Sequence, residues 1–144
     1  MPPDTVVVID TAPVIAYLEG SLDITPAAAV VFDEWIVKGR NNAVLSAITV
    51  AELLVGPKRS GSGLQPLRDF LLTFPNLRCV DVTVAIADDA ATVRASTPIK
   101  MPDALIIATA TNYNAHLITN DFDWEKYCPS SPIATLQRFV TRDP

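Results

Sequence analysis

Short β-branched runs alternate with helix-forming segments along this chain, and this alternation restricts the fold more than any other feature. Residues 5–9, T-V-V-V-I, have the character of a strand buried on both faces of a parallel sheet. Further strands are predicted at residues 43–45, 77–80 and 116–119, with a weaker one at 131–136. We therefore predict an α/β fold, a doubly wound parallel sheet of four to five strands, in a single domain over residues 1–144.

Helix patterns fill the segments between these runs. The first is predicted from residue 11 to Gly20, and Thr25-Pro26 opens a second that ends at Gly39. Ser46 caps a third, which we expect Gly56-Pro57 to end, leaving K-R-S-G-S-G as a mobile basic loop. Three more are predicted at residues 67–74, 82–95 and 102–113. The inward face of the second helix is expected to carry Ala28, Val31, Phe32, Trp35 and Ile36.

Composition narrows the class of protein. The start, M-P-P-D-T, lacks the basic residues of a signal peptide, and no run approaches about 18 apolar residues, so we expect neither secretion nor a membrane span. Cys79 and Cys128 have no metal-type spacing and suit reduced thiols in a cytoplasmic protein. The net charge of −5 argues weakly against a nucleic-acid partner, but bound cations would reverse the local sign of any acidic site.

Four acidic residues stand where a predicted strand or helix meets a turn: Asp10, Glu52, Asp103 and Asp121. No Lys or Arg occurs in the surrounding segments 6–20, 46–56, 101–110 and 118–124. Two carboxylates about 4 Å apart repel by roughly 4 kcal/mol at an effective dielectric near 20. If the fold brings the four together, a divalent cation with oxygen ligands, Mg²⁺ or Mn²⁺, is the natural compensation, and it points to metal-assisted chemistry on phosphate.

Each acid also has an ordinary structural explanation. Asp10 could be a helix N-cap, and Asp103 could simply stabilise the first turn of its helix. Glu52 follows Thr49 at the spacing of a capping box, and Asp121 could be a turn residue. Taken singly, each explanation is the commoner one. The four together, with Glu52 on a partly apolar helix where an acid needs a partner, favour a functional site.

The segments that carry these acids resemble the PIN domain nucleases, and specifically the VapC-type toxins of bacterial toxin–antitoxin pairs. The matching stretches are V-V-V-I-D-T-A-P-V-I-A-Y-L, S-A-I-T-V-A-E-L-L-V-G, K-M-P-D-A-L-I-I-A-T-A and H-L-I-T-N-D-F-D-W. They follow the family order and cover nearly the whole chain. The resemblance implies a three-layer α/β/α fold and a Mg²⁺- or Mn²⁺-dependent endoribonuclease that leaves 5′-phosphates.

The same resemblance assigns roles to residues and partners. Asp10, Glu52 and Asp103 match the three constant metal-binding and catalytic acids, and Asp121 matches a more variable fourth, with Asp123 as the fallback. Thr119 matches a hydroxyl residue before the fourth acid, whereas Asn120 shapes the turn and Trp124 fills an apolar slot. The implied partners are RNA, a VapB-type antitoxin protein that packs between helices, and a second copy of the chain. The apolar faces after Thr25 and over residues 67–74 could receive the antitoxin, although such faces more often form the core.

Other candidate residues and alternative functions are less strongly supported by the sequence. His116, the only histidine, lacks acid–base partners beside its strand and is interpreted as structural. Lys58, Arg59 and Lys100 are candidate phosphate contacts or ordinary surface charges, and Trp35 is core rather than a stacking platform. A PIN-type domain that only binds RNA is the alternative. A phosphoacceptor receiver domain is a poorer fit, because no Lys follows the predicted fifth strand.

Overall fold

The computed structural model describes residues 2–20 and 23–136, and its centre is a five-stranded parallel sheet. The strand order is β3-β2-β1-β4-β5. The strands are β1 (Val6–Ile9), β2 (Asn42–Ser46), β3 (Leu77–Val80), β4 (His116–Thr119) and β5 (Ile133–Thr135). The prediction of an α/β fold with a parallel sheet is confirmed.

The chain winds in two directions from β1. It passes through β2 to β3 on one side and then crosses back to place β4 on the other side of β1. In such sheets ligands collect at the carboxyl ends of the strands where the winding reverses. The register pairs Ile9 of β1 with Ile118 of β4, so the two strands end at nearly the same level.

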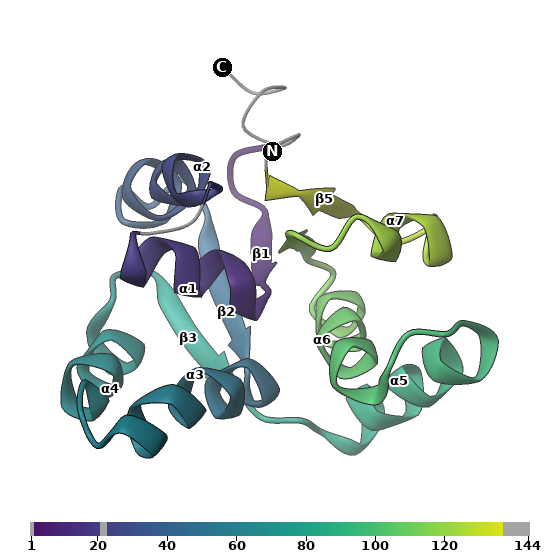
Figure 1. The fold of residues 1–144 in the computed structure, drawn as a ribbon. Helices are drawn as coiled ribbons and strands as arrows, with labels where there is room; N and C mark the ends of the chain where they lie inside the picture. Colours follow the sequence, from purple (N-terminus) through teal and green to yellow (C-terminus); the bar gives the residue numbers. More distant parts are fainter. Residues whose placement is uncertain (1, 21–22, 137–144) are drawn as a thin grey trace.

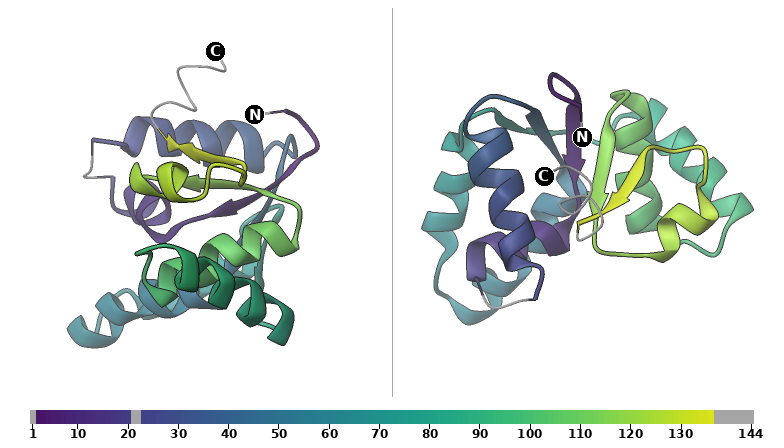
Figure 2. Two further views of the ribbon diagram at one scale, coloured as in Figure 1. Left: turned by 90° about the vertical axis from the view of Figure 1, so that its right-hand side faces the viewer. Right: turned by 90° about the horizontal axis from the view of Figure 1, so that it is seen from above.

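Helices cover both faces of the sheet, which gives the three layers visible in Figures 1 and 2. One face packs against α1 (Thr11–Glu19), α2 (Thr25–Ala29), its π-helical continuation η1 (Val30–Ile36) and α4 (Leu64–Thr73). The other face packs against α5 (Val84–Ser96), α6 (Met101–Asn112) and the short α7 (Asp123–Tyr127). Helix α3 (Ala47–Ser60) contributes Leu53 to the first side and Ile48 to the second.

Alternation along the strands builds the two cores. In β1, Val7 and Ile9 face the first core, whereas Val8 faces the second, and all three are essentially buried. The predicted inward face of the second helix is confirmed, since Phe32 and its four partners are buried. A fully buried side chain of this size stabilises the fold by about 1.5–3 kcal/mol. That helix face is therefore core and leaves no surface for an antitoxin.

One predicted helix boundary is wrong. Helix α3 does not stop at Gly56-Pro57 but continues to Ser60 with Pro57 inside it, so Lys58 and Arg59 lie in its last turn rather than in a loop. The actual end is Gly61, whose positive φ of 73° and N–H bond to the Pro57 carbonyl form a left-handed cap. Pro57 is half-buried and lines a hollow together with Leu53 and Leu67, and the helix continues past it although proline cannot donate a backbone hydrogen bond.

No helix within residues 2–20 and 23–136 has both the length and the apolar character needed to cross a bilayer.

Candidate active site

Asp10 occupies the carboxyl end of β1, at the junction with α1. Its extended backbone makes it the N-cap of α1, and its Oδ1 accepts a 2.7 Å hydrogen bond from the N–H of Thr11. The side chain is 9% exposed, which makes it the most buried of the four predicted acids. Asp10 can therefore cap α1 through Oδ1 and still have a functional role, because its second oxygen, Oδ2, takes no part in the cap.

A chain of hydrogen bonds links Asp10 to the end of β4. The hydroxyl of Thr119 donates to Asp10 Oδ2 at 2.9 Å and accepts the N–H of Asp121 at 3.0 Å. Asp121 Oδ1 in turn accepts the N–H of Asp123 at 2.9 Å. The Thr119 hydroxyl, which the resemblance placed just before the fourth acid, therefore fixes both the first acid and the turn that carries the fourth.

Glu52 reaches the same region from α3. Its Oε1 accepts a 2.9 Å hydrogen bond from the hydroxyl of Thr11, the residue next to Asp10. Helix α3 is partly buried, as its apolar residues indicate, and Glu52 has the partner that was expected; the Glu52 side chain itself is exposed, because the apolar face of α3 turns Leu53 inward. Thr11 was not singled out from sequence, and the only signal was a hydroxyl directly after Asp10.

The carboxylates surround a polar hollow of about 480 Å³. Three of the predicted acids, Asp10, Asp103 and Asp121, line it together with Asp123. An adjoining hollow of about 360 Å³ shares Asp103, Asp121 and Asp123 with the first and extends to Lys100 and Tyr127. Glu52 lines neither hollow and joins the group through Thr11.

The electrostatics of the group follow from burial and like charges. Burial is the main cause that raises the pKa of Asp10 to about 6, with further increases from the charges of Asp103 and Glu52. The hydrogen bonds from Thr11 and Thr119 only partly oppose these effects. The pKa of Asp103 is raised by burial and by the charges of Glu52 and Asp121, against a smaller opposing effect of Lys100.

These carboxylates fit a hard divalent cation in the chemistry of their donors. All are oxygen ligands of the kind that Mg²⁺ and Mn²⁺ prefer, and a cation would relieve the repulsion that raises the Asp10 and Asp103 pKa values. In the described part of the chain, no three Asp, Glu, His or Cys side chains converge into a ready-made metal cluster.

The other residues considered from the sequence are Lys100, Asn120, Trp124 and His116. Lys100 lines the adjoining hollow, and Asn120 lines the acidic one. Trp124 is 3% exposed and packs in the second core, as expected for its apolar slot. His116 begins β4, at the opposite end of the strand from the acids, and burial lowers its pKa. The interpretation of His116 as structural agrees with this position.

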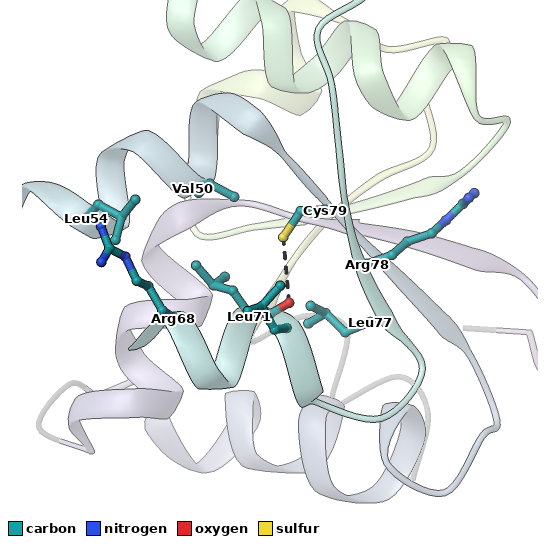
Figure 3. A pocket seen from close by; sticks show the side chains of 8 residues that line it. Val50, Leu54, Arg68, Leu71, Leu77, Arg78 and Cys79 are labelled. Atoms are coloured by element: carbon teal, nitrogen blue, oxygen red, sulfur yellow. Dashed lines mark hydrogen bonds between the residues drawn. The ribbon is translucent and has the colours of Figure 1, made fainter. Parts of the chain in front are cut away.

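An apolar hollow of similar size, about 490 Å³, lies away from the acids between α3, α4 and the edge strand β3 (Figure 3). Arg68 and Arg78 stand on opposite sides of its lining. Leu72, which also lines it, is 82% exposed. The lining lacks acids and bases suited to catalysis, so this hollow is a candidate contact surface rather than an active site. Its apolar side chains are Val50, Leu54, Leu71, Leu72 and Leu77, with Cys79.

Comparison with known proteins adds to this geometry. Residues 7–128 match the family described as the PIN domain. A toxin–antitoxin complex from Klebsiella pneumoniae contains a chain 25% identical to this one, with a TM-score of 0.71 over 90% of this chain and 97% of that chain. VapBC2 from Rickettsia felis, bound to a DNA fragment from their promoter, is 20% identical with a TM-score of 0.70, over 90% of this chain and 98% of that one.

A third similar structure is VapC20 of Mycobacterium tuberculosis, described as a sarcin-ricin loop cleaving toxin. It is 13% identical with a TM-score of 0.67, over 83% of this chain and 93% of that one. At 20% identity or below, the second and third likenesses concern the fold alone. None of the curated proteins compared with this sequence matches it.

Proposed function

The chain belongs to the PIN domain family of nucleases, and from this premise we propose that it is a metal-dependent endoribonuclease that acts as the toxin of a toxin–antitoxin pair. The observation that carries the proposal is the hydrogen-bonded link between Asp10, Thr119 and Asp121, with Asp103 on the same hollow. We propose Asp10, Glu52, Asp103 and Asp121 as the metal-binding and catalytic residues. Asp123 is the reserve for the fourth position.

Each carboxylate has its own part in the proposed site. Asp10 holds the cation from the buried side, in an orientation fixed by Thr11 and Thr119. Asp103 and Asp121, which line the hollow, would supply further oxygen ligands, and Glu52 would add one from α3 by exchanging its hydrogen bond with Thr11 for the cation. Mg²⁺ or Mn²⁺, once bound, lowers the pKa of a coordinated water and offsets phosphate charge. Hydrolysis of the P–O3′ bond of the RNA would leave a 5′-phosphate and a 3′-hydroxyl, and this chemistry would not need His116 as a base.

Two hollows suit the proposed protein partners. A groove of about 360 Å³ between α1, α3 and α4 is lined by Ile15, Leu18, Leu53, Pro57 and Leu67, and we assign it to an apolar segment of the antitoxin. We assign the hollow beside β3 to a second copy of the chain, since Leu72 protrudes next to an apolar depression on the same face. A two-fold dimer would insert Leu72 of each copy into the depression of the other.

Two substitutions test these contacts. Leu72→Asp should convert a dimer of 15.5 kDa chains to a monomer in light scattering, while Val37→Asp, at an exposed apolar residue elsewhere, should not. Leu18→Asp should weaken binding of the proposed antitoxin without changing the dimer. A wild-type monomer, or a dimer insensitive to Leu72→Asp, would contradict the second-copy assignment.

We place the protein in the cytoplasm, where cellular RNA is available. Cys79 and Cys128 are free thiols, which suits a reducing compartment.

The proposed nuclease activity is tested on total cellular RNA. Purified protein should cleave RNA with Mg²⁺ or Mn²⁺, stop in EDTA, and leave 5′-phosphate ends. Asp10→Asn and Glu52→Gln should each lose at least about 100-fold in rate, since an interaction of about 2.7 kcal/mol or more is removed. Asp88→Asn, at an exposed acid of α5, is the matched control and should retain full activity. Tight metal and RNA binding without cleavage would instead favour a domain that only binds RNA.

A further inference from the structure

Phe122 lies beside the acidic hollow with its ring in solvent. The side chain is 61% exposed and lines the hollow together with Asp10, Asp103 and Asp121. It is the only aromatic residue among the exposed large apolar side chains of the described residues. Single exposed apolar side chains are common on protein surfaces, so the informative feature of Phe122 is not its exposure but its place on the hollow that four carboxylates line.

The position of Phe122 is fixed by the network that orients the acids. The N–H of Asp121, on one side of it, bonds to the Thr119 hydroxyl at 3.0 Å. The N–H of Asp123, on the other side, bonds to Asp121 Oδ1 at 2.9 Å. Because Thr119 also holds Asp10, the backbone of Phe122 is tied to the first acid through two hydrogen bonds. The ring is thus presented to solvent from a turn with little freedom.

The two adjoining hollows form one trough that passes the acids. The four residues common to both are Asp103, Asp121, Asp123 and Trp124. Beyond them, one end carries Phe122 and the other carries Lys100 and Tyr127. A strand of nucleic acid that runs through both hollows would pass the acids, Phe122 and Lys100.

We propose that Phe122 stacks on an unpaired nucleobase next to the phosphate that is cleaved, and so selects single-stranded RNA. This inference rests on the proposed function and adds a base-binding subsite to it. An aromatic face stacks on any base, whereas the bases of a duplex present no free face to it. Phe122 has no polar group with which to read base identity, so it positions the strand and contributes binding, with only a weak preference among bases.

The test uses a short single-stranded RNA that contains one mapped cut site, and the same RNA with an abasic residue on either side of that site. Stacking of one base on an aromatic ring corresponds to about a 5- to 100-fold change in binding. Phe122→Ala should raise KM by that factor and change kcat by less than about threefold. Phe122→Tyr and Phe122→Trp should restore KM, because each retains a stacking face.

The abasic RNAs separate stacking from a general effect. For the wild-type protein, removal of the base that stacks should raise KM as much as Phe122→Ala does. In Phe122→Ala the same abasic RNA should cause no further loss. Val84→Ala, at an 88% exposed apolar residue of α5, is the matched control and should leave KM unchanged. Thermal unfolding of each variant confirms that its fold is intact, as expected at exposed positions.

The outcomes distinguish this subsite from the nuclease itself. A wild-type KM in Phe122→Ala, with active wild-type protein, would overturn the stacking subsite and leave the nuclease proposal standing. Losses in Phe122→Ala that simply add to those of the abasic RNA would also overturn it. Failure of the wild-type protein to cleave any RNA in Mg²⁺ or Mn²⁺ would refute the proposed function.

Discussion

The hydroxyl of Thr119 donates a 2.9 Å hydrogen bond to Asp10 Oδ2, although the two residues are 109 positions apart in the chain. The parallel pairing of β1 and β4 brings them together, because both strands end at the same edge of the sheet. The bond leaves Asp10 charged and oriented in a place where burial opposes its charge. The bond therefore joins the ends of two paired strands and at the same time orients a proposed metal ligand.

Thr119→Val should weaken both the fold and the site. Valine has the same shape but cannot hold Asp10 or accept the Asp121 N–H, so the N–H loses its partner. We expect a loss of about 1–3 kcal/mol in the free energy of unfolding and a 10- to 100-fold weaker Mn²⁺ affinity, measured by urea titration and calorimetry. Thr119→Ser keeps the hydroxyl and should retain Mn²⁺ affinity within about threefold. An equal loss in both variants would mean that packing, not the hydrogen bonds, matters at Thr119.

Asp10→Asn should stabilise the metal-free protein while abolishing cleavage. The folded-state pKa of Asp10 is raised from 3.8 to about 6, so at pH 7.5 the fold carries a buried charge that it disfavours. Removing this charge should add about 1–3 kcal/mol to the free energy of unfolding. With millimolar Mn²⁺ the order should reverse, since the cation stabilises only the wild-type protein. A variant less stable than the metal-free wild type at pH 7.5 would contradict this reading of Asp10.

The same pKa shift predicts how this difference depends on pH. Because the folded state holds the Asp10 proton more tightly than the unfolded chain, Asp10 lowers stability progressively as pH rises from about 3.8 through about 6. The stability gap between Asp10→Asn and the wild type should therefore be small near pH 4 and complete above pH 7. Urea unfolding of both proteins in EDTA across this range measures it.

Asp121→Asn should reduce cleavage more than Asp123→Asn. Both acids line the hollow, but after burial and the charge of Glu52 it is the charge of Asp121, and not that of Asp123, that raises the pKa of Asp103. Asparagine at 121 can still accept the Asp123 N–H, so the turn stays intact. Initial rates at saturating Mn²⁺ should fall by at least about tenfold for Asp121→Asn and by less than threefold for Asp123→Asn. The reverse order would assign the fourth position to Asp123.

Tyr17 gives the fold a dependence on alkaline pH that is unrelated to the acidic site. Its hydroxyl donates to Asp33 at 2.7 Å, and its ring stacks on Phe32 with centroids 4.4 Å apart. Burial, with the Asp33 hydrogen bond and charge, raises the pKa of Tyr17 to about 12. The neutral phenol stabilises the fold fully below about pH 10, and this contribution is lost as pH rises from 10 through 12. Tyr17→Phe should lack that alkaline loss in urea unfolding between pH 8 and 11; an unchanged profile would exclude Tyr17 as its cause.

Much of this arrangement could be predicted from the sequence because it depends on local patterns. The apolar run that ends at Asp10 identifies a buried strand and its exit, and alternating strands and helices imply that Asp10 and Asp121 share an edge of the sheet. The predicted end of α3 was wrong because Gly-Pro usually ends a helix, whereas here the helix continues through Pro57 to the left-handed cap at Gly61.

Features that depend on side-chain direction were beyond the reach of the sequence. The exposure of Glu52 follows from how α3 rolls on the core, and its bond to Thr11 joins residues 41 positions apart. The sequence predicted Trp124 in the apolar slot, but nothing in T-N-D-F-D-W indicated that the Phe122 ring would then lie in solvent.

The central claim is that the carboxylates hold a divalent cation with which the protein cleaves RNA. Its most direct test is to add Mn²⁺ back to EDTA-stripped protein and to measure the initial rate at which one labelled RNA is cleaved. We expect no cleavage without metal and a rate that saturates as Mn²⁺ is added. For Asp10→Asn the rate should be at least about 100-fold lower at every Mn²⁺ concentration. Cleavage at the same rate in EDTA, or by Asp10→Asn as fast as by the wild-type protein, would contradict it.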